Sequence, residues 1–407
     1  MRVLFAHRFL PGQYRHLAAA LVDAGDEVTF VHAVDGEAPS GVRCVRAEPT
    51  RAASAETHHY VQAFENQVLL GQAVYRACAT LAAEGFRPDV VCAHAGFGPG
   101  LYLPDAFARA PVVGYFEWFY RARGADADFL DPEAVTPDEA LRIRTRNAGI
   151  LSELAQCARA IAPTRFQRDQ FPEPLRAKLE VLHDGVDVDA FAAGRVPQAA
   201  LGVPGLPEDA ELVVHATRGL EEYRGFPQFM AAIALLQAER PRLHALVLGE
   251  DRTFYGRPPP DGRGWRGIML ARLPALDRAR VHFLGTLPTA SDRRVLAASH
   301  AHVYLTVPFV PSWSLVEAMA AGASIVGSDT APVREFLDDG EQGLLAEMRD
   351  PGAIAAAVAR LLDDRALAVR LGAAARARAA RDYALATLLP RHVALLRDVA
   401  QPRISTS

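Results

Sequence analysis

Two arginines, Arg218 and Arg224, stand six residues apart in the segment A-T-R-G-L-E-E-Y-R-G-F, directly after a short apolar run. Guanidinium groups bind phosphate oxygens in a bidentate manner, and a tight turn can bring two of them to one pyrophosphate. The pair therefore predicts a site that can bind a pyrophosphate group, whereas two exposed, salt-bridged arginines are the structural alternative.

A second candidate anion site lies in the segment W-S-L-V-E, where helical spacing of apolar residues begins after a loop. The start of a helix offers free backbone N–H groups and the positive end of the helix dipole. We therefore expect Trp313 at a phosphate, with the N–H groups of Ser314 and Leu315 as donors to it. Glu317, one turn further on, can accept two hydroxyl hydrogen bonds, as from a ribose. The alternative is an ordinary first-turn glutamate that faces solvent.

The first half of the chain offers three further candidates. His94 ends an apolar strand at residues 88–94, and strand carboxyl ends face the ligand crevice in doubly wound sheets. Gly12, in the loop after the first strand, allows a ligand to approach the backbone closely, although it equally suits a turn. Glu117 stands among the aromatic residues of F-E-W-F-Y, which suggests contact with a sugar ring or an apolar acceptor, or else a packed loop anchor.

Metal-ligand patterns are weak. Asp126 and Asp128 have the D-x-D spacing of some metal-dependent transferases, but no strand precedes them. His58 and His59 are adjacent, so on a helix their side chains diverge. The four cysteines are scattered and are expected to be small buried hydrophobes. No metal site and no cofactor is predicted.

The elements that must position these residues form two successive α/β series. A strand at 2–6, a helix at 16–24 and a strand at 27–32 make a Rossmann-like start, and the absence of G-x-G-x-x-G argues against a dinucleotide. The alternation restarts at 212–215 after a Gly- and Pro-rich linker at 190–207. The expected helices of the first series also include 55–84, 101–108 and 138–158.

Composition limits the classes of function. The 407 residues suit two domains, half of them are hydrophobic, and the formal net charge is −4, which argues against a nucleic-acid partner. The chain enters a strand at once and contains no apolar run of membrane-spanning length, so we expect a cytoplasmic protein. Lys178 is the only lysine, and this arginine bias with alanine-rich helices suggests a bacterial, GC-rich genome.

The segment from Glu317 to Gly340 resembles the nucleotide-sugar site of retaining glycosyltransferases of family 4. The shared positions are Glu317, Ala318, Met319, Ala320, Gly322, Ser328, Asp329, Glu335 and Gly340. Arg218 and Arg224-Gly225 match that family's R-x(5)-K-G pattern, with arginine for lysine. The resemblance implies the GT-B fold, in which two Rossmann-like domains face each other across a cleft. The expected domains are 1–192, joined by a helix at about 384–407, and 193–383.

The same resemblance implies roles for further residues. His94 would lie at the donor sugar, Gly12 at the donor phosphate, and the strand-end residues Gly249 and Gly285 near the nucleotide. Phe309 stands where the family has the first acid of its E-x7-E pair, which generally reaches the sugar hydroxyls. Its aromatic ring puts this contact with the donor sugar in question, but not the contact with the nucleotide.

The implied function is a retaining, metal-independent transfer of a sugar from a nucleoside diphosphate such as UDP or GDP to an acceptor hydroxyl. A sugar, lipid-linked or small-metabolite acceptor remains open. Within the fold, the alternatives are a nucleotide-sugar epimerase and a glycoside phosphorylase. Outside enzymes, the alternative is a catalytically silent protein that binds a nucleotide sugar.

Overall fold

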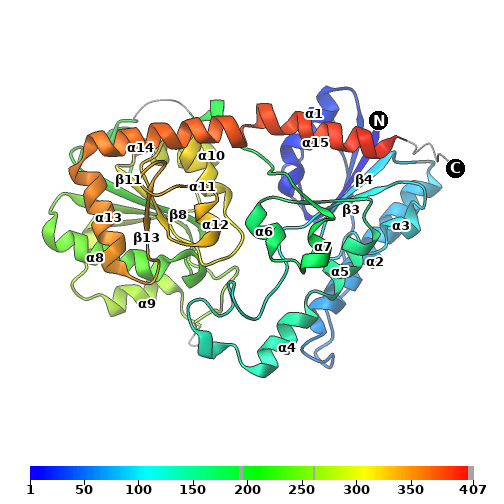
Figure 1. Ribbon diagram of the computed structural model, residues 1–407, viewed down its shortest axis with the longest axis horizontal. Coiled ribbons are helices and arrows are strands. Elements are labelled where there is room, and N and C mark those ends of the chain that lie inside the picture. Colours follow the sequence, from blue (N-terminus) through cyan, green and yellow to red (C-terminus); the bar gives the residue numbers. More distant parts are fainter. Residues whose placement is uncertain (192–195, 260–261, 402–407) are drawn as a thin grey trace. The chain divides into compact units, whose positions relative to one another are not determined.

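A computed structural model describes residues 1–191, 196–259 and 262–401 (Figure 1). The chain divides into two compact units. The N-terminal unit comprises Met1–Gly185 together with Leu385–Ser407, and the C-terminal unit comprises Val186–Ala384. The division at Gly185 comes before the expected linker, and the expected boundary between residues 192 and 193 lies outside the described residues.

The N-terminal unit is built on a seven-stranded parallel sheet of order β3-β2-β1-β4-β5-β6-β7. The strands are β1 (Arg2–Phe9), β2 (Glu27–Val34), β3 (Arg43–Arg46), β4 (Val90–His94), β5 (Val112–Tyr115), β6 (Arg159–Ala162) and β7 (Leu179–Val181). The order reverses between β1 and β4, and doubly wound sheets bind ligands at the carboxyl ends of strands beside such a reversal. β4 is buried along its whole length, as expected of an inner parallel strand covered on both faces.

The helices of this unit are α1 (Arg15–Asp23), α2 (Gln62–Ala83), α3 (Leu103–Ala106), α4 (Pro137–Thr145), α5 (Ala148–Gln156), α6 (Arg165–Asp169) and α7 (Glu173–Arg176). The prediction of one helix over 138–158 is wrong, because the chain breaks between α4 and α5. The side chain of Asn147 accepts from the backbone N–H of Tyr120 and donates to its carbonyl, both at 2.9 Å. These two bonds fix a turn at Asn147. α2 also begins later than expected, after His58 and His59.

Helix α15 (Leu385–Ala400) belongs to the N-terminal unit and lies beside α1 (Figure 1). Leu388, Leu395 and Leu396 are buried in the same cluster as the strand residues of β1. The guanidinium of Arg397 contacts buried Asp26 at 2.8 Å. The last segment of the described chain therefore completes the core of the first unit.

The C-terminal unit carries a six-stranded parallel sheet of order β10-β9-β8-β11-β12-β13. Its strands are β8 (Glu211–Gly219), β9 (Leu243–Glu250), β10 (Val281–Gly285), β11 (Ala301–Tyr304), β12 (Ile325–Ser328) and β13 (Leu344–Ala346). Its helices are α8 (Phe226–Glu239), α9 (Trp265–Arg272), α10 (Thr289–Ala298), α11 (Trp313–Ala320), α12 (Ala331–Arg334), α13 (Pro351–Asp363) and α14 (Arg365–Arg378). Helix α11 buries Leu315, Val316 and Met319 against this sheet's core, which fixes where its first turn lies.

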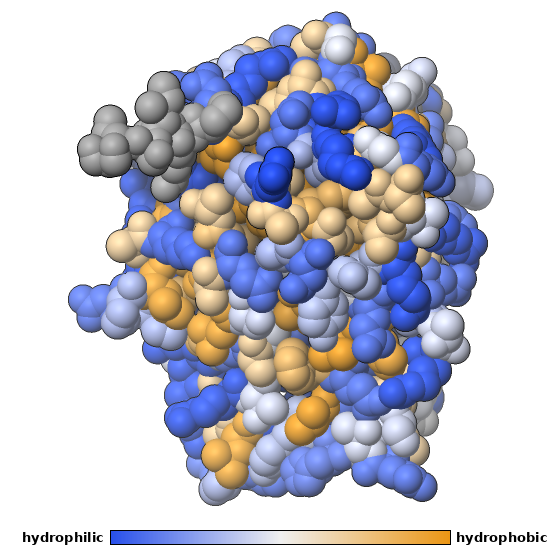
Figure 2. Space-filling model, turned by 90° about the vertical axis from the view of Figure 1, so that its right-hand side faces the viewer, coloured by the Kyte–Doolittle hydropathy of each residue, from blue (hydrophilic) through white to orange (hydrophobic). Residues whose placement is uncertain are grey.

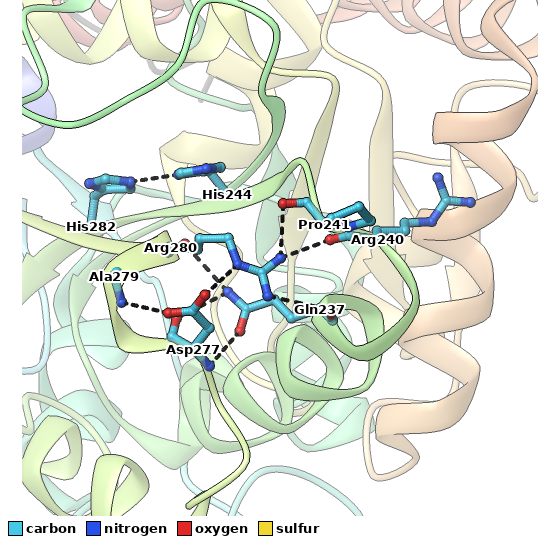
Figure 3. A network of polar contacts seen from close by, with 8 residues as sticks. All are labelled: Gln237, Arg240, Pro241, His244, Asp277, Ala279, Arg280 and His282. Carbon is cyan, nitrogen blue, oxygen red and sulfur yellow. Dashed lines mark hydrogen bonds and ion pairs between the residues drawn. The ribbon is translucent and has the colours of Figure 1, made fainter.

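A polar network ties the end of α8 to the amino ends of β9 and β10 (Figure 3). The guanidinium of Arg280 donates to Asp277 at 2.7 Å and to the carbonyl of Arg240 at 2.8 Å. Beside it, the rings of His244 and His282 stack, with Nδ1 of the first 3.0 Å from Nε2 of the second. This network braces the end of the sheet opposite to the carboxyl ends of the strands.

A membrane span requires a helix of sufficient length and hydropathy. Within residues 1–191, 196–259 and 262–401, no helix combines the length and hydrophobicity needed to cross a bilayer. In the face shown in Figure 2, hydrophobic patches are interrupted by hydrophilic residues. Three of the four cysteines are buried as expected, but Cys44 is exposed because it lies on the edge strand β3.

Candidate functional site

The two arginines lie at and just after the carboxyl end of β8, an inner strand of the C-terminal sheet. Arg218 is the penultimate residue of β8 and is exposed, whereas Arg224 follows in a 3-10 turn and is 5% exposed. Nη1 of Arg224 donates to Thr306 Oγ1 at 2.9 Å and to the carbonyl of Val310 at 3.0 Å. Among the described residues, no carboxylate pairs with either guanidinium. Both charges are thus available to an anionic ligand.

Aromatic rings cover the faces of these guanidiniums. Cζ of Arg218 lies 4.3 Å from the ring centre of Phe254, and Cζ of Arg224 lies 4.9 Å from Tyr255 and 5.7 Å from Phe309. Such stacking leaves the N–H groups at the edge of the guanidinium plane to form hydrogen bonds. Phe309, expected near the donor sugar, is buried and contacts Arg224 together with the rings of Tyr223 and Tyr255.

The start of α11 is capped from within, and this corrects the expectation of free N–H groups. Ser312 is the N-cap, and its hydroxyl accepts from the N–H of Ser314 at 3.2 Å. The N–H of Leu315 donates to the carbonyl of Ser312 at 3.1 Å. The serine satisfies a donor that the helix start would otherwise leave unpaired. Trp313, the first residue of the helix, is 47% exposed.

Glu317 lies one turn inside α11 and is largely buried. The pKa of its carboxyl is raised to about 7, first by burial and then by the nearby Asp292, while Arg293 acts in the opposite direction. Asp292, in α10, also has a raised pKa caused first by burial, and its buried Oδ1 has no hydrogen-bond partner in the part of the chain that the structure describes. Two carboxyl groups therefore share a low-dielectric environment next to the start of α11.

The two strand-end glycines of this unit have conformational roles. Gly249 has φ +130°, and a Cβ there would lie 2.4 Å from the carbonyl oxygen of Thr217, so β9 could not approach β8 with any other residue. Gly285, which ends β10, has φ +66° and open space where a Cβ would be. The turn after β10 needs the left-handed conformation, which glycine adopts without steric cost.

In the N-terminal unit, the structure brings together His94 and Glu117, which follow neighbouring strands. His94 is 2% exposed, and its Nε2 lies 3.4 Å from a carboxylate oxygen of Glu117. The other oxygen of Glu117 accepts from Nε2 of Gln13 at 2.5 Å. The ring of His94 stacks on Phe97 at 5.4 Å and meets the edge of His7 at 4.5 Å. This cluster lies at the carboxyl ends of β1, β4 and β5.

Two of these residues, His7 and Gln13, are absent from the sequence-based site. Burial lowers the pKa of His7 well below its usual value, and the neighbouring His94 lowers it further, so His7 is neutral. A Cβ on Gly12, whose φ is +51°, would lie 2.7 Å from Cε1 of His7. Gly12 is thus required by close packing against His7. The sequence offered one signal: His7 lies shortly before the end of the first strand and Gln13 lies in the loop that follows it.

The aromatic residues beside Glu117 do not surround it. Phe116 and Phe119 pack on Phe171, with ring centres 6.0 and 5.0 Å apart, and Tyr120 stacks under the guanidinium of Arg146 at 3.7 Å. These contacts agree with the alternative expectation, in which these three rings anchor a packed loop. Their apolar faces are used to anchor the segment after β5, which leaves Glu117 to face the polar cluster.

The glycine-rich loop after His94 is held by a buried acid that sequence reasoning missed. Glu153, in α5, accepts from the N–H of Gly96 at 3.0 Å and from the N–H of Gly100 at 2.9 Å. Burial raises the pKa of Glu153 to about 7, and the two N–H donors oppose that rise. Its partners lie more than fifty residues away in the chain, so no local pattern indicates them.

In the D-x-D segment, the structure shows a local contact of Asp128 with the backbone. The carboxylate of Asp128 accepts the N–H of Gly124 at 3.0 Å and closes a local turn. Across the described parts of the chain, no group of three His, Cys, Asp or Glu side chains is placed to hold a metal ion.

Comparison with known proteins finds glycosyltransferase relatives of both halves of the chain. The family model described as "Glycosyl transferase family 4 group" matches residues 24–191, and the model "Glycosyl transferases group 1" matches residues 210–364. The D-inositol 3-phosphate glycosyltransferase of Streptomyces avermitilis is 30% identical over 256 residues, which cover 60% of this chain and 52% of that protein. The match thus spans about half the length of that relative. The glycogen synthase of Mycobacterium tuberculosis is 26% identical over 90% of this chain and 86% of its own length.

Among solved structures, Anabaena HepE in complex with UDP-glucose superimposes with a TM-score of 0.70 at 17% identity, covering 98% of this chain and all of that one. At this identity the likeness shows the fold, and the fold is the expected GT-B type with two parallel-sheet domains. With matching glycosyltransferase models over both halves and two parallel-sheet domains of the GT-B type, the chain belongs to the GT-B glycosyltransferases of family 4.

Proposed function

We propose that the chain is a retaining glycosyltransferase that moves a sugar from a nucleoside diphosphate to an acceptor hydroxyl without a metal ion. The observation that carries this proposal is Arg224. Its guanidinium is almost fully buried, is fixed by Thr306 and Val310, and has no carboxylate partner among the described residues. A buried, uncompensated guanidinium is costly unless a ligand supplies the opposing charge.

In the proposed reaction, the bond between the sugar and the β-phosphate breaks and negative charge grows on the diphosphate. Arg218 and Arg224 stabilise that charge, since preorganised positive groups act on charge as it develops. The start of α11 contributes its dipole and, where the phosphate displaces the hydroxyl of Ser312, the N–H of Ser314. Glu317 binds the ribose hydroxyls, and exposed Trp313 lies at the same helix start.

The N-terminal unit supplies the groups proposed for the sugar and acceptor. His94 and Glu117 lie within 3.4 Å of each other, and Gln13 holds the carboxylate of Glu117. We assign His94 to the donor sugar and Glu117 to the acceptor. Two relatives favour a small polyol: one is a D-inositol 3-phosphate glycosyltransferase, and another is a phosphatidyl-myo-inositol mannosyltransferase. We therefore place sugar-like polyols, free or lipid-linked, first among acceptors.

A thermal-shift panel of UDP- and GDP-sugars is the first test, followed by donor turnover with polyol acceptors. A ligand at 100 times its dissociation constant adds about 2.7 kcal/mol of stability, which is readily visible. UDP-glucose is the first donor to test, because a structural neighbour was solved with it. Failure of every nucleotide sugar to stabilise the protein would refute the proposal.

The geometry at Phe309 keeps one alternative open, a catalytically silent protein that binds a nucleotide sugar. The ring packs on Arg224 and Tyr255 and offers no hydrogen-bond acceptor to a sugar hydroxyl. Binding of a nucleotide sugar without turnover under any acceptor would favour that alternative. Formation of an isomeric sugar without acceptor would instead indicate an epimerase, and a requirement for inorganic phosphate would indicate a phosphorylase.

A further inference from the structure

We propose that Glu221 is a positioning residue: it folds the loop at residues 252–256 over Arg218 and Arg224 and so sets the geometry in which the two guanidiniums meet a diphosphate. This inference rests on the proposed function, because it assigns a new role at the same site. It concerns a side chain that neither the spacing of the motif nor the chemistry of the reaction singles out.

Glu221 stands between the two arginines in the chain but pairs with neither of them in the described structure. It is fully buried, and its carboxylate accepts three backbone N–H groups. Oε2 accepts from Gly256 at 2.7 Å and from Tyr255 at 3.0 Å, while Oε1 accepts from Phe254 at 3.3 Å. A buried carboxylate without an ion pair requires such donors, since its desolvation is otherwise unfavourable. The three bonds therefore determine the path of the loop.

Two of these three loop residues, Phe254 and Tyr255, each place a ring against one of the arginines. Phe254 lies under the guanidinium of Arg218 at 4.3 Å, and Tyr255 lies under that of Arg224 at 4.9 Å. Glu221 thus acts on both arginines through one short segment.

Two glycines provide independent support that the loop is built to lie here. A Cβ on Gly219 would be 2.3 Å from the carbonyl oxygen of Arg252 and 2.5 Å from Cδ2 of Phe254. A Cβ on Gly256 would be 2.9 Å from Cδ1 of Tyr223. Any larger residue at Gly219 would push the loop away from the arginines.

The physical effect is preorganisation. An arginine side chain has many rotamers, and ordering it costs free energy when a ligand binds. Rings stacked on both guanidiniums reduce that cost in advance, and fixed charges stabilise a developing charge better than mobile ones. Because backbone N–H groups bind the carboxylate of Glu221, this carboxylate does not neutralise Arg218 or Arg224, and both guanidiniums can interact with the ligand.

The test compares the affinities of UDP and UMP, and of GDP and GMP, measured by titration calorimetry. The ratio of the monophosphate to the diphosphate dissociation constant measures how much the second phosphate adds to the affinity. We expect Glu221→Ala to lower this ratio by about tenfold, the loss of roughly one charge-assisted hydrogen bond, with little change for the monophosphate. Glu221→Gln keeps a carbonyl oxygen for Tyr255 and Gly256, so it should retain most of the ratio. Glu239→Gln, on the exposed surface of α8, is the matched control.

Should Glu221→Ala fail to fold, as its melting temperature without ligand will show, a Phe254→Leu/Tyr255→Leu double variant removes the rings and leaves the carboxylate in place. It should lower the ratio to the level of Glu221→Ala. An unchanged ratio in that double variant, alongside a lowered ratio in Arg224→Ala, overturns the role of Glu221. An unchanged ratio in Arg224→Ala instead refutes the proposed function at this site, so the two failures are distinguishable.

Discussion

The pH dependence of nucleotide-sugar binding gives a direct test of the role proposed for Glu317. Only the ionised carboxylate can accept both ribose hydroxyls, and burial raises the pKa of this group to about 7. The ionised fraction then rises from about 10% at pH 6 to about 90% at pH 8. Affinity should accordingly increase by about tenfold across this interval, which corresponds to about 1.4 kcal/mol.

The assay is calorimetric titration of a nucleotide sugar at several pH values. The sugar ester is preferred to the free diphosphate, because the terminal phosphate of a free diphosphate titrates in the same range. Glu317→Gln should bind more weakly and lose the pH dependence. Asp292→Asn should move the midpoint to lower pH, since the charge of Asp292 raises the pKa of Glu317. Affinity that stays constant from pH 6 to 8 would refute the assignment of Glu317 to the ribose.

Other measurements address other parts of the molecule. Arg224→Ala should lower kcat by about 10² to 10³-fold, the usual loss for one preorganised charge-stabilising donor; an unaltered kcat would exclude it from that role. Glu153→Gln should lower the melting temperature, because an amide cannot accept from the N–H groups of both Gly96 and Gly100; an equal melting temperature would contradict this. Burial lowers the pKa values of His244 and His282, so the unfolded chain takes up protons before the folded one does. The free energy of unfolding should therefore decrease as pH falls below about 6.5, and replacing His282 by asparagine should make this decrease smaller. A chelator should leave turnover unchanged; activity lost with the chelator and restored by magnesium would point to a metal.

The sequence predicts the two parallel sheets well, because inner parallel strands are short apolar runs that local composition reveals. It predicts poorly where long-range contacts override local preference. The residues around 138–158 have helical spacing, yet bonds between Asn147 and Tyr120 break the helix. The rings around Glu117 suggested a platform, but their partners, such as Phe171 and Arg146, lie far away in the chain.

The candidate site shows the same limit. Residue type and spacing single out Arg218, Arg224 and Glu317 as candidates, because guanidinium groups suit phosphate and a carboxylate suits ribose hydroxyls. Glu153 and Glu221 escape detection, since each one bonds to backbone N–H groups, which carry no sequence signature. Such acids are visible only once the loops they hold have been placed in space.

The docking of α15 on the first unit has a consequence for biosynthesis. Leu388, Leu395 and Leu396 fill a core whose other members come mostly from the first half of the chain. During translation, the part of that core next to α1 that α15 covers stays exposed until the whole of Val186–Ala384 has emerged from the ribosome. The unit made first is therefore the last to be completed, and its uncovered apolar surface is a point at which the nascent chain is prone to aggregate or to recruit chaperones.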